Sequence, residues 1–192
     1  MRTFNGHWPA LLTPYTNMDE VDTRMLCQLV DYQLAKKVTG FYICGSTGEG
    51  SFLSVDERMQ VAEIVINHLA GRAPVLVHVG STCLKDGIHL ARHAQQLGAV
   101  GISSILPAVI YDSRGIVPYF EKLAGAVPEM PFLPYLFGGT RDCLSLTREL
   151  AHIPNFVGTK YYGSNMYEMS QLVRFREHNW TVFHGMDEQA AL

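Results

Sequence analysis

Short apolar runs alternate with amphipathic segments along the chain. Seven of these runs are rich in β-branched and aromatic residues and are bounded by glycine, proline or polar residues, as buried strands are. They cover residues 8–15, 40–47, 73–80, 100–107, 130–137, 156–160 and 180–185. The pattern therefore predicts seven strands.

The segments between the runs show the periodicity of helices with one apolar face. In 54–72, Ser54 is followed three residues later by Glu57, the pattern of a capping box, and Gly71 marks the end. The same periodicity predicts helices within 22–37, 85–98 and 164–178.

Strand and helix alternate at intervals of about 25 to 33 residues, which is typical of β-α units around a parallel sheet. Polar residues follow nearly every run, which favours a (β/α)8 TIM barrel over an open doubly wound sheet, because the barrel builds its site from many strand ends. Such a barrel takes about 250 residues. We therefore expect one α/β domain over residues 1–192, a barrel truncated after its seventh strand and incomplete at the C-terminus.

Composition narrows the class of protein. The chain is 47% hydrophobic and 17% charged, as soluble globular proteins are, and its net charge of -3 without a basic cluster argues against nucleic acid as a partner. No apolar run reaches membrane length and the start lacks a secretory signal, so a cytoplasmic location is expected, with no membrane partner. The four widely spaced cysteines suggest neither disulfides nor a zinc site.

Three features carry possible chemistry. Lys160 ends an apolar run; burial there would lower the pKa of its amine, and a neutral amine attacks a ketone to form a Schiff base. Tyr135 ends a neighbouring run and offers a phenol that can move a proton. Ser46 and Thr47 lie on a glycine-flanked turn that can hold a carboxylate. Each also has a plain alternative: a surface lysine, a packing tyrosine and an ordinary loop.

Taken together, these segments resemble a known family. The stretches GFYICGSTGEGSFLSVDERMQVAEIV, VLVHVGS, IPNFVGTK and HGMDEQ, with Tyr135 between the second and third, are similar to the pyruvate-dependent class I aldolases. That family contains N-acetylneuraminate lyase and dihydrodipicolinate synthase. The resemblance runs in order from about Gly6 to the end of the chain.

The resemblance implies a (β/α)8 barrel, usually a homotetramer, that uses no metal or organic cofactor. Lys160 would form the Schiff base with pyruvate or another 2-keto acid, Tyr135 would move the proton, and Ser46 with Thr47 would bind the carboxylate. The iminium accepts the electrons of the breaking C3–C4 bond while the phenol takes the proton of the C4 hydroxyl. The chain is then expected to be a carbon-carbon lyase.

Within the family, Asp187 and Glu188 match an acidic pair that binds sugar hydroxyls in the sialic acid lyases, although adjacent carboxylates also suit a helix N-terminus. N-acetylneuraminate is therefore the expected substrate. Dihydrodipicolinate synthase is the alternative, but the place of its arginine holds Thr140, with Arg141 one residue off.

Several residues depart from the pattern. Tyr162 stands where the lyases usually have a threonine near the substrate carboxylate, so we expect it to bind substrate, and Tyr111 is a weak match for a tyrosine that reaches a neighbouring subunit. The segment after Tyr135 lacks the usual Asn and Pro. Another sugar-derived 2-keto acid, or a non-catalytic protein that only binds a 2-keto acid, therefore stays open. His89 and His93 have metal-binding spacing but no evident third ligand.

Overall fold

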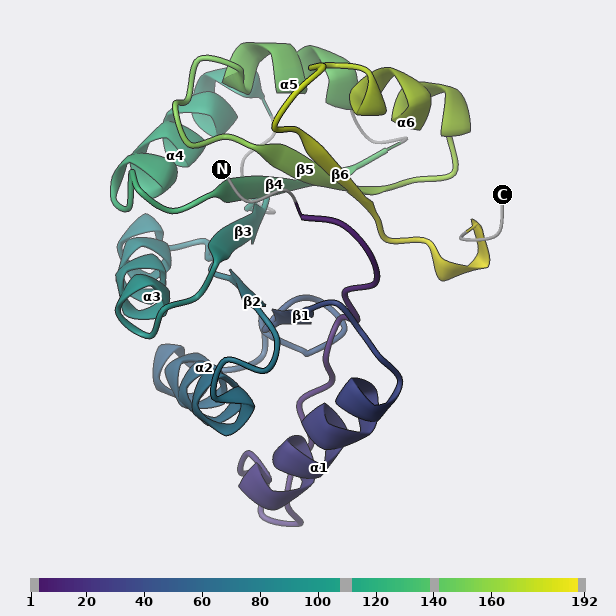
Figure 1. The fold of residues 1–192 in the computed structure, drawn as a ribbon. Helices are drawn as coiled ribbons and strands as arrows, with labels where there is room; N and C mark the ends of the chain where they lie inside the picture. Colours follow the sequence, from purple (N-terminus) through teal and green to yellow (C-terminus); the bar gives the residue numbers. More distant parts are fainter. Residues whose placement is uncertain (1–3, 108–111, 139–141, 190–192) are drawn as a thin grey trace.

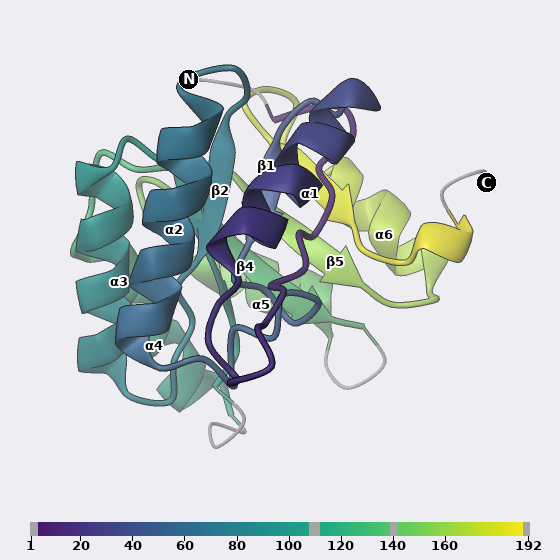
Figure 2. The same cartoon turned by 90° about the horizontal axis from the view of Figure 1, so that it is seen from below.

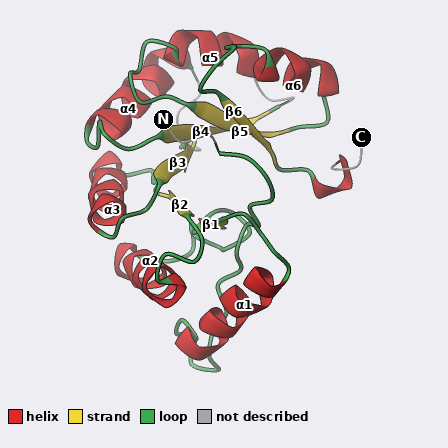
Figure 3. Cartoon of the chain, viewed as in Figure 1, coloured by secondary structure: helices red, strands yellow, loops and turns green. Residues whose placement is uncertain are grey.

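The computed structural model describes residues 4–107, 112–138 and 142–189. It contains α-helices and β-strands in strict alternation after an initial helix (Figures 1 and 3). The strands are β1 (Phe41–Ile43), β2 (Val75–His78), β3 (Gly101–Ile105), β4 (Phe132–Phe137), β5 (Gly158–Tyr162) and β6 (Thr181–His184). The helices are α1 (Thr23–Ala35), α2 (Val55–Leu69), α3 (Leu84–Gln96), α4 (Ser113–Gly125), α5 (Cys143–Leu150) and α6 (Met166–Val173), and a 3-10 turn covers Asp187–Gln189.

The six strands form one parallel sheet in the order β1-β2-β3-β4-β5-β6. Each strand therefore pairs with its neighbour in sequence, as β-α units dictate. The sheet curves, and the helices follow each other around its outer side (Figure 1). Figure 2 shows α2 and α3 side by side on that outer side. The architecture is an α/β half-barrel.

The first predicted strand, 8–15, is wrong. That segment makes only isolated bridges, a parallel one between Ala10 and Tyr42 and an antiparallel one between Tyr15 and Val21, although it exchanges backbone hydrogen bonds with β1. Pro9 and Pro14 have no N–H to donate, so the ladder cannot extend along the segment. Among the described residues, six of the seven predicted strands are present.

The strand around Lys160 is offset from its prediction. The run 156–160 was expected to end at the lysine, but β5 covers Gly158–Tyr162, so Lys160 is its central residue. Two tyrosines continue the strand because Tyr161 is buried against the helices. Lys160 is therefore held by paired backbone on both sides.

Helix predictions hold for the four segments named from periodicity. In α2, the side chain of Ser54 accepts from the Glu57 amide and Glu57 accepts from the Ser54 amide, so the capping box is confirmed. The helix within 164–178 is shorter than expected: α6 stops at Val173, and the Trp180 indole donates to the Leu172 carbonyl at 2.8 Å. The helices predicted from periodicity do not include α4, which contains Pro118, or the eight-residue α5.

Buried apolar side chains form two clusters on the two sides of the sheet. The larger one lies between the sheet and the helices and includes Leu26, Val65 and Phe120. The smaller one lies on the inner side of the curve and consists of Phe4, Tyr42, Leu76, Leu133 and Val157, with partly buried side chains packed against it. Burial on both sides explains why the strands read as continuous apolar runs.

The amino-terminal segment contacts the last strand across the inner side of the sheet (Figure 1). Thr181 Oγ1 donates to the Phe4 carbonyl at 3.1 Å. The Phe183 ring lies 6.3 Å from the Phe4 ring and 5.6 Å from the Trp8 ring. These contacts join the two ends of the described chain. Among the residues described, no helix has the length and apolar character needed to cross a bilayer.

Candidate active site

Lys160 and Tyr135 lie next to each other on β5 and β4, where they are paired in register. Paired residues of adjacent strands point to the same side of a sheet, so both side chains enter the inner side. The Lys160 Nζ atom lies 4.1 Å from the centre of the Tyr135 ring and 4.3 Å from the centre of the Tyr42 ring on β1. The amine is thus held against two aromatic rings.

This position changes the ionisation of the amine. Burial lowers the pKa of Lys160 from 10.5 to about 8, and the nearby charge of Asp187 opposes that shift. At pH 7 roughly one amine in ten is then uncharged, compared with fewer than about one in a thousand for an ordinary lysine. The structure places Lys160 where a neutral nucleophile is available.

Tyr135 is buried beside this amine. Burial and the neighbouring Tyr162 raise the pKa of its phenol to about 12, while a hydrogen bond with the Ser46 side chain lowers it. The phenol therefore stays protonated at neutral pH. Through the Ser46 hydroxyl it is connected to the turn that follows β1.

That turn has a strained backbone. Cys44 and Glu49 have φ angles of 56° and 54°, and a Cβ atom on Gly50 would come within 1.9 Å of the Cys44 carbonyl oxygen. Only glycine fits at position 50. The turn is fixed by Thr13, whose hydroxyl donates to the Gly48 carbonyl at 2.7 Å. Strain of this kind is concentrated at functional sites.

A pocket of about 540 Å³ opens above Lys160. It receives Thr47 from the turn, Tyr162 from β5 and Asp187 from the 3-10 turn. Its complete lining is Gly6, His7, Trp8, Pro9, Ala10, Gln33, Tyr42, Thr47, Tyr135, Lys160, Tyr162, Val182, Phe183, His184, Gly185 and Asp187. Five of the seven residues expected from the sequence thus line this pocket, and Ser46 is joined to it by its hydrogen bond with Tyr135. Glu188 is exposed and does not line the pocket.

One wall of the pocket is aromatic. The Phe137 ring stacks on the Tyr135 ring at 4.8 Å between centres and lies 5.4 Å from the Tyr162 ring. Tyr162 is 40% exposed, so its ring reaches the opening. Of the segment after Tyr135 that lacks the usual Asn and Pro, residues 139–141 lie outside the described residues.

Tyr42 was not singled out from the sequence. It is buried, and its hydroxyl donates to the Ser103 hydroxyl on β3 at 3.0 Å. The signal that could have found it is an aromatic residue with a polar end inside the run 40–47, three residues before the glycine of the turn. Its ring reaches Lys160 from the opposite side of the inner space.

A buried histidine lies below the turn. The His78 Nε2 atom accepts from the Ile105 amide at 2.9 Å, and the ring makes a second hydrogen bond with the Cys44 backbone. Arg58 of α2 lies against it and donates to the His78 carbonyl at 2.7 Å and to the Gly80 carbonyl at 3.0 Å. These bonds connect the ends of three strands to the turn.

Burial, and then the charges of Arg58 and Lys160, lower the pKa of His78 to about 3. The imidazole is therefore neutral. The sequence showed this residue only as part of a family-like segment; a polar residue at the end of the run 73–80 was the available sign.

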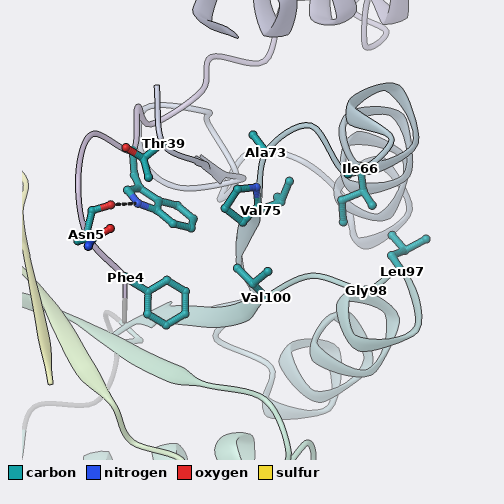
Figure 4. A pocket seen from close by; sticks show the side chains of 12 residues that line it. Phe4, Asn5, Thr39, Ile66, Ala73, Val75, Leu97, Gly98 and Val100 are labelled. Carbon is teal, nitrogen blue, oxygen red and sulfur yellow. Dashed lines mark hydrogen bonds between the residues drawn. The ribbon is translucent and has the colours of Figure 1, made fainter. Parts of the chain in front are cut away.

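Other pockets lie away from the amine. One of about 530 Å³ is on the other side of the turn and is lined by Ser46, Arg58 and His78 among others. Another of about 640 Å³ lies near the amino-terminal ends of the strands, where Phe4, Ile66 and Leu97 surround it (Figure 4). None of the described residues that line this last pocket has an ionisable side chain.

No group of three His, Cys, Asp or Glu side chains that could hold a metal ion occurs among the described residues. His93 instead pairs with Glu63 at 2.9 Å. Metal-free and cofactor-free chemistry stays a prediction. Tyr111, Thr140 and Arg141 lie outside the described residues.

The sequence of this chain is similar to a known protein family and to individual members of it. The model of the Dihydrodipicolinate synthetase family matches residues 3–192. N-acetylneuraminate lyase of Danio rerio is 31% identical, and the alignment covers 98% of this chain and 65% of that protein. The 4-hydroxy-tetrahydrodipicolinate synthase of Caldicellulosiruptor bescii is also 31% identical, with the same two coverages.

Among solved structures, the N-acetylneuraminate lyase of Aliivibrio salmonicida superposes with a TM-score of 0.92 at 28% identity. The match covers 98% of this chain and 65% of that one. The chain thus spans about 65% of the length of these relatives.

Proposed function

Because this chain belongs to the dihydrodipicolinate synthetase family, we propose that it is an aldolase-type carbon-carbon lyase that forms a Schiff base between Lys160 and a 2-keto acid. The observation that carries the proposal is the Lys160 amine, held between Tyr42 and Tyr135 in a pocket with its pKa lowered to about 8. A buried neutral amine is the form that attacks a keto carbon.

The chemistry follows from the groups around the amine. Attack of Lys160 on the C2 carbonyl, with uptake of one proton and loss of one water, gives an iminium. The Tyr135 phenol supplies the proton that is taken up in this step. The iminium then accepts the electron pair of the C3–C4 bond while the C4 hydroxyl returns a proton to the Tyr135 oxygen, which yields an aldehyde and an enamine. Protonation of the enamine at C3 and hydrolysis release pyruvate and restore the amine.

We assign carboxylate binding to Ser46 and Thr47. Thr47 lines the pocket of Lys160, and Ser46 is joined to Tyr135 by a hydrogen bond. A carboxylate bound at this turn would lie next to the keto carbon, within reach of the amine. Tyr162, at the opening, would contact the rest of the substrate.

For the substrate we propose N-acetylneuraminate, or another sugar-derived 2-keto acid. Asp187 lines the pocket and can accept hydrogen bonds from sugar hydroxyls, whereas Glu188, the second residue of the expected pair, does not reach it. The alternative is the dihydrodipicolinate synthase reaction, and equal identity to a relative of each kind does not choose between them. A homotetramer and a cytoplasmic location stay predictions of the resemblance.

Borohydride reduction in the presence of pyruvate tests the proposal. We expect a stable adduct of one reduced pyruvate on the Lys160 peptide, detected by mass spectrometry, and a reaction rate that rises with pH through about 8 as the amine loses its proton. Lys160→Arg should abolish the adduct. Lys122→Arg, a change at an exposed lysine of α4, should retain it.

An unmodified Lys160 would refute the proposal. If the adduct forms, release of pyruvate from N-acetylneuraminate is compared with condensation of pyruvate and aspartate semialdehyde. Turnover of the first but not the second supports the lyase. An adduct without turnover of either compound would favour the non-catalytic alternative, a protein that binds a 2-keto acid.

A further inference from the structure

Tyr42 contacts the reacting nitrogen through its ring and not through its hydroxyl. The hydroxyl donates to Ser103 at 3.0 Å, while the ring centre lies 4.3 Å from Lys160 Nζ. The side chain is 3% exposed, so the ring has little freedom to turn away. The packing of the inner core therefore holds the Tyr42 ring against Lys160.

Two opposite effects act on a charge at this nitrogen. Burial disfavours the charge, whereas the negative face of an aromatic ring favours it, and more strongly where water is excluded. The exposed pair of Tyr32 on α1 and Lys36, the residue that follows this helix, has 5.3 Å between amine and ring centre. It offers a comparison in which water weakens the same contact.

We propose that Tyr42 is a further catalytic residue, whose ring face stabilises positive charge on Lys160 Nζ in both the ammonium and the Schiff-base iminium. The second half of this statement rests on the proposed function. Condensation of the amine with a ketone takes up one proton, releases one water and leaves a C=N bond whose nitrogen carries the charge. That nitrogen stays beside the ring because the lysine Cε atom holds it there.

Tyr135 cannot give the charged nitrogen the same constant stabilisation as Tyr42. Its ring also faces the amine, at 4.1 Å, but its phenol belongs to the pocket, where proton movement would change the charge of the ring itself. Tyr42 is bound to Ser103 and keeps its hydroxyl proton, since burial raises the pKa of its phenol further. The Tyr42 ring is thus a constant partner through the reaction.

Fluorination tests the ring face without changing its shape. The pKa of the free Lys160 amine is measured by NMR of protein labelled with 15N-lysine, for Tyr42→Phe and for Tyr42→3,4,5-trifluorophenylalanine. Fluorine withdraws the negative charge of the ring face, so we expect the trifluoro variant to have a Lys160 pKa lower by about one pH unit. Tyr42→Phe should stay near the wild type, because it keeps the ring.

Tyr42→Leu removes the ring and should lower the pKa of Lys160 in the same direction. Tyr32→Leu is the matched control, since it removes an exposed ring beside a lysine and should leave Lys160 unchanged. An equal Lys160 pKa in the phenylalanine and trifluorophenylalanine variants would overturn the proposal, and so would a change produced by Tyr42→Phe alone. If the leucine variant does not fold, the fluorinated pair still decides.

A separate measurement tests whether the Tyr42 ring stabilises the Schiff-base iminium. The dissociation constant of the pyruvate Schiff base should rise about 2- to 30-fold from Tyr42→Phe to the trifluoro variant. A wild-type protein that forms no adduct refutes the proposed function, but the pKa comparison on the free amine still tests Tyr42. An adduct of equal stability in both variants refutes the role of Tyr42 in the iminium and leaves the proposed function standing.

Discussion

Burial moves three ionisable side chains near the carboxyl ends of the strands towards their neutral forms. It lowers the pKa of Lys160 to about 8 and that of His78 to about 3, and it raises that of Tyr135 to about 12. Bases lose their proton and the acid keeps its own. The inner space therefore combines an amine that is partly uncharged at neutral pH with a phenol that still carries a proton, which suits addition to a carbonyl.

Tyr135 has the clearest expected effect on turnover. In Tyr135→Phe the Schiff base with pyruvate should still form, because the ring that contacts Lys160 remains. Cleavage of the carbon-carbon bond should slow about 10²- to 10⁴-fold, the usual contribution of a positioned acid or base. Stopped-flow release of pyruvate measures the rate. Tyr32→Phe, on the exposed side of α1, serves as the control.

His78 should make stability depend on pH. The unfolded imidazole binds a proton below about pH 6.5, but the folded one does so only near pH 3, so the stability that neutral His78 contributes is lost as the pH falls through this interval. We expect about 2 to 3 kcal/mol less stability at pH 4.5 than at pH 7 from this group.

Urea unfolding of the wild type and of His78→Gln at several pH values measures this contribution. The glutamine variant should be less stable at pH 7 but should lose less stability on acidification. Parallel pH profiles for the two proteins would contradict the assignment.

Some functional residues can be found from their neighbours in the sequence, and others cannot. Lys160 was found because a charged residue in an apolar run is unusual. Tyr42 and His78 were missed because their roles depend on partners in other strands, Lys160 and Ser103 for the first and Ile105 for the second. Their own sequence context is that of ordinary core residues.

At the scale of elements, the prediction succeeded where a local pattern defines the element and failed where pairing or packing with distant residues defines it. The helix α2 was predicted within a few residues because its capping box is a local pattern. The segment 8–15 was expected to be a strand, but two prolines limit its pairing to isolated bridges. Strand β5 extends past Lys160 because Tyr161 packs outward, a tertiary effect that no local pattern indicates.

Tyr161 connects β5 to two helices. Its hydroxyl donates to Glu168 Oε2 of α6 at 2.8 Å, and Glu168 Oε1 accepts from the Cys143 amide of α5 at 2.8 Å. Because Lys160 precedes Tyr161, this connection fixes the strand that carries the amine.

We expect Tyr161→Phe to lower the free energy of unfolding by about 1 to 3 kcal/mol, since a partly buried hydrogen bond to a carboxylate is lost. It should also slow adduct formation with pyruvate, because the strand is held less firmly. Tyr167→Phe changes an exposed tyrosine of α6, the helix that carries Glu168, and should have neither effect. Chemical denaturation and borohydride trapping give the two readouts.

At the scale of the whole molecule, alternation of strands and helices predicted the parallel sheet and its outer helices, and the half-barrel confirms that part. The contact of the amino-terminal segment with β6 was not predicted. It joins Phe4 to Thr181 and Phe183, which lie far apart in sequence, and no local pattern encodes such a pairing.

Phe4 tests the importance of that contact. It is 6% exposed in the inner cluster, so Phe4→Ala should lower the free energy of unfolding by about 3 to 5 kcal/mol. Phe52→Ala, at a side chain that is 86% exposed, should change it by less than about 0.5 kcal/mol. Urea unfolding followed by tryptophan fluorescence compares them. Equal stability of the two variants would show that the Phe4 contact does not hold the ends together.

The chain has five lysines, at positions 36, 37, 85, 122 and 160. Reagents that acylate only uncharged amines should, at mildly alkaline pH, react at position 160 well ahead of an ordinary surface lysine, provided that they are small enough to enter between the two rings. A probe or a covalent inhibitor could thus be attached selectively to the Lys160 amine, without an engineered cysteine.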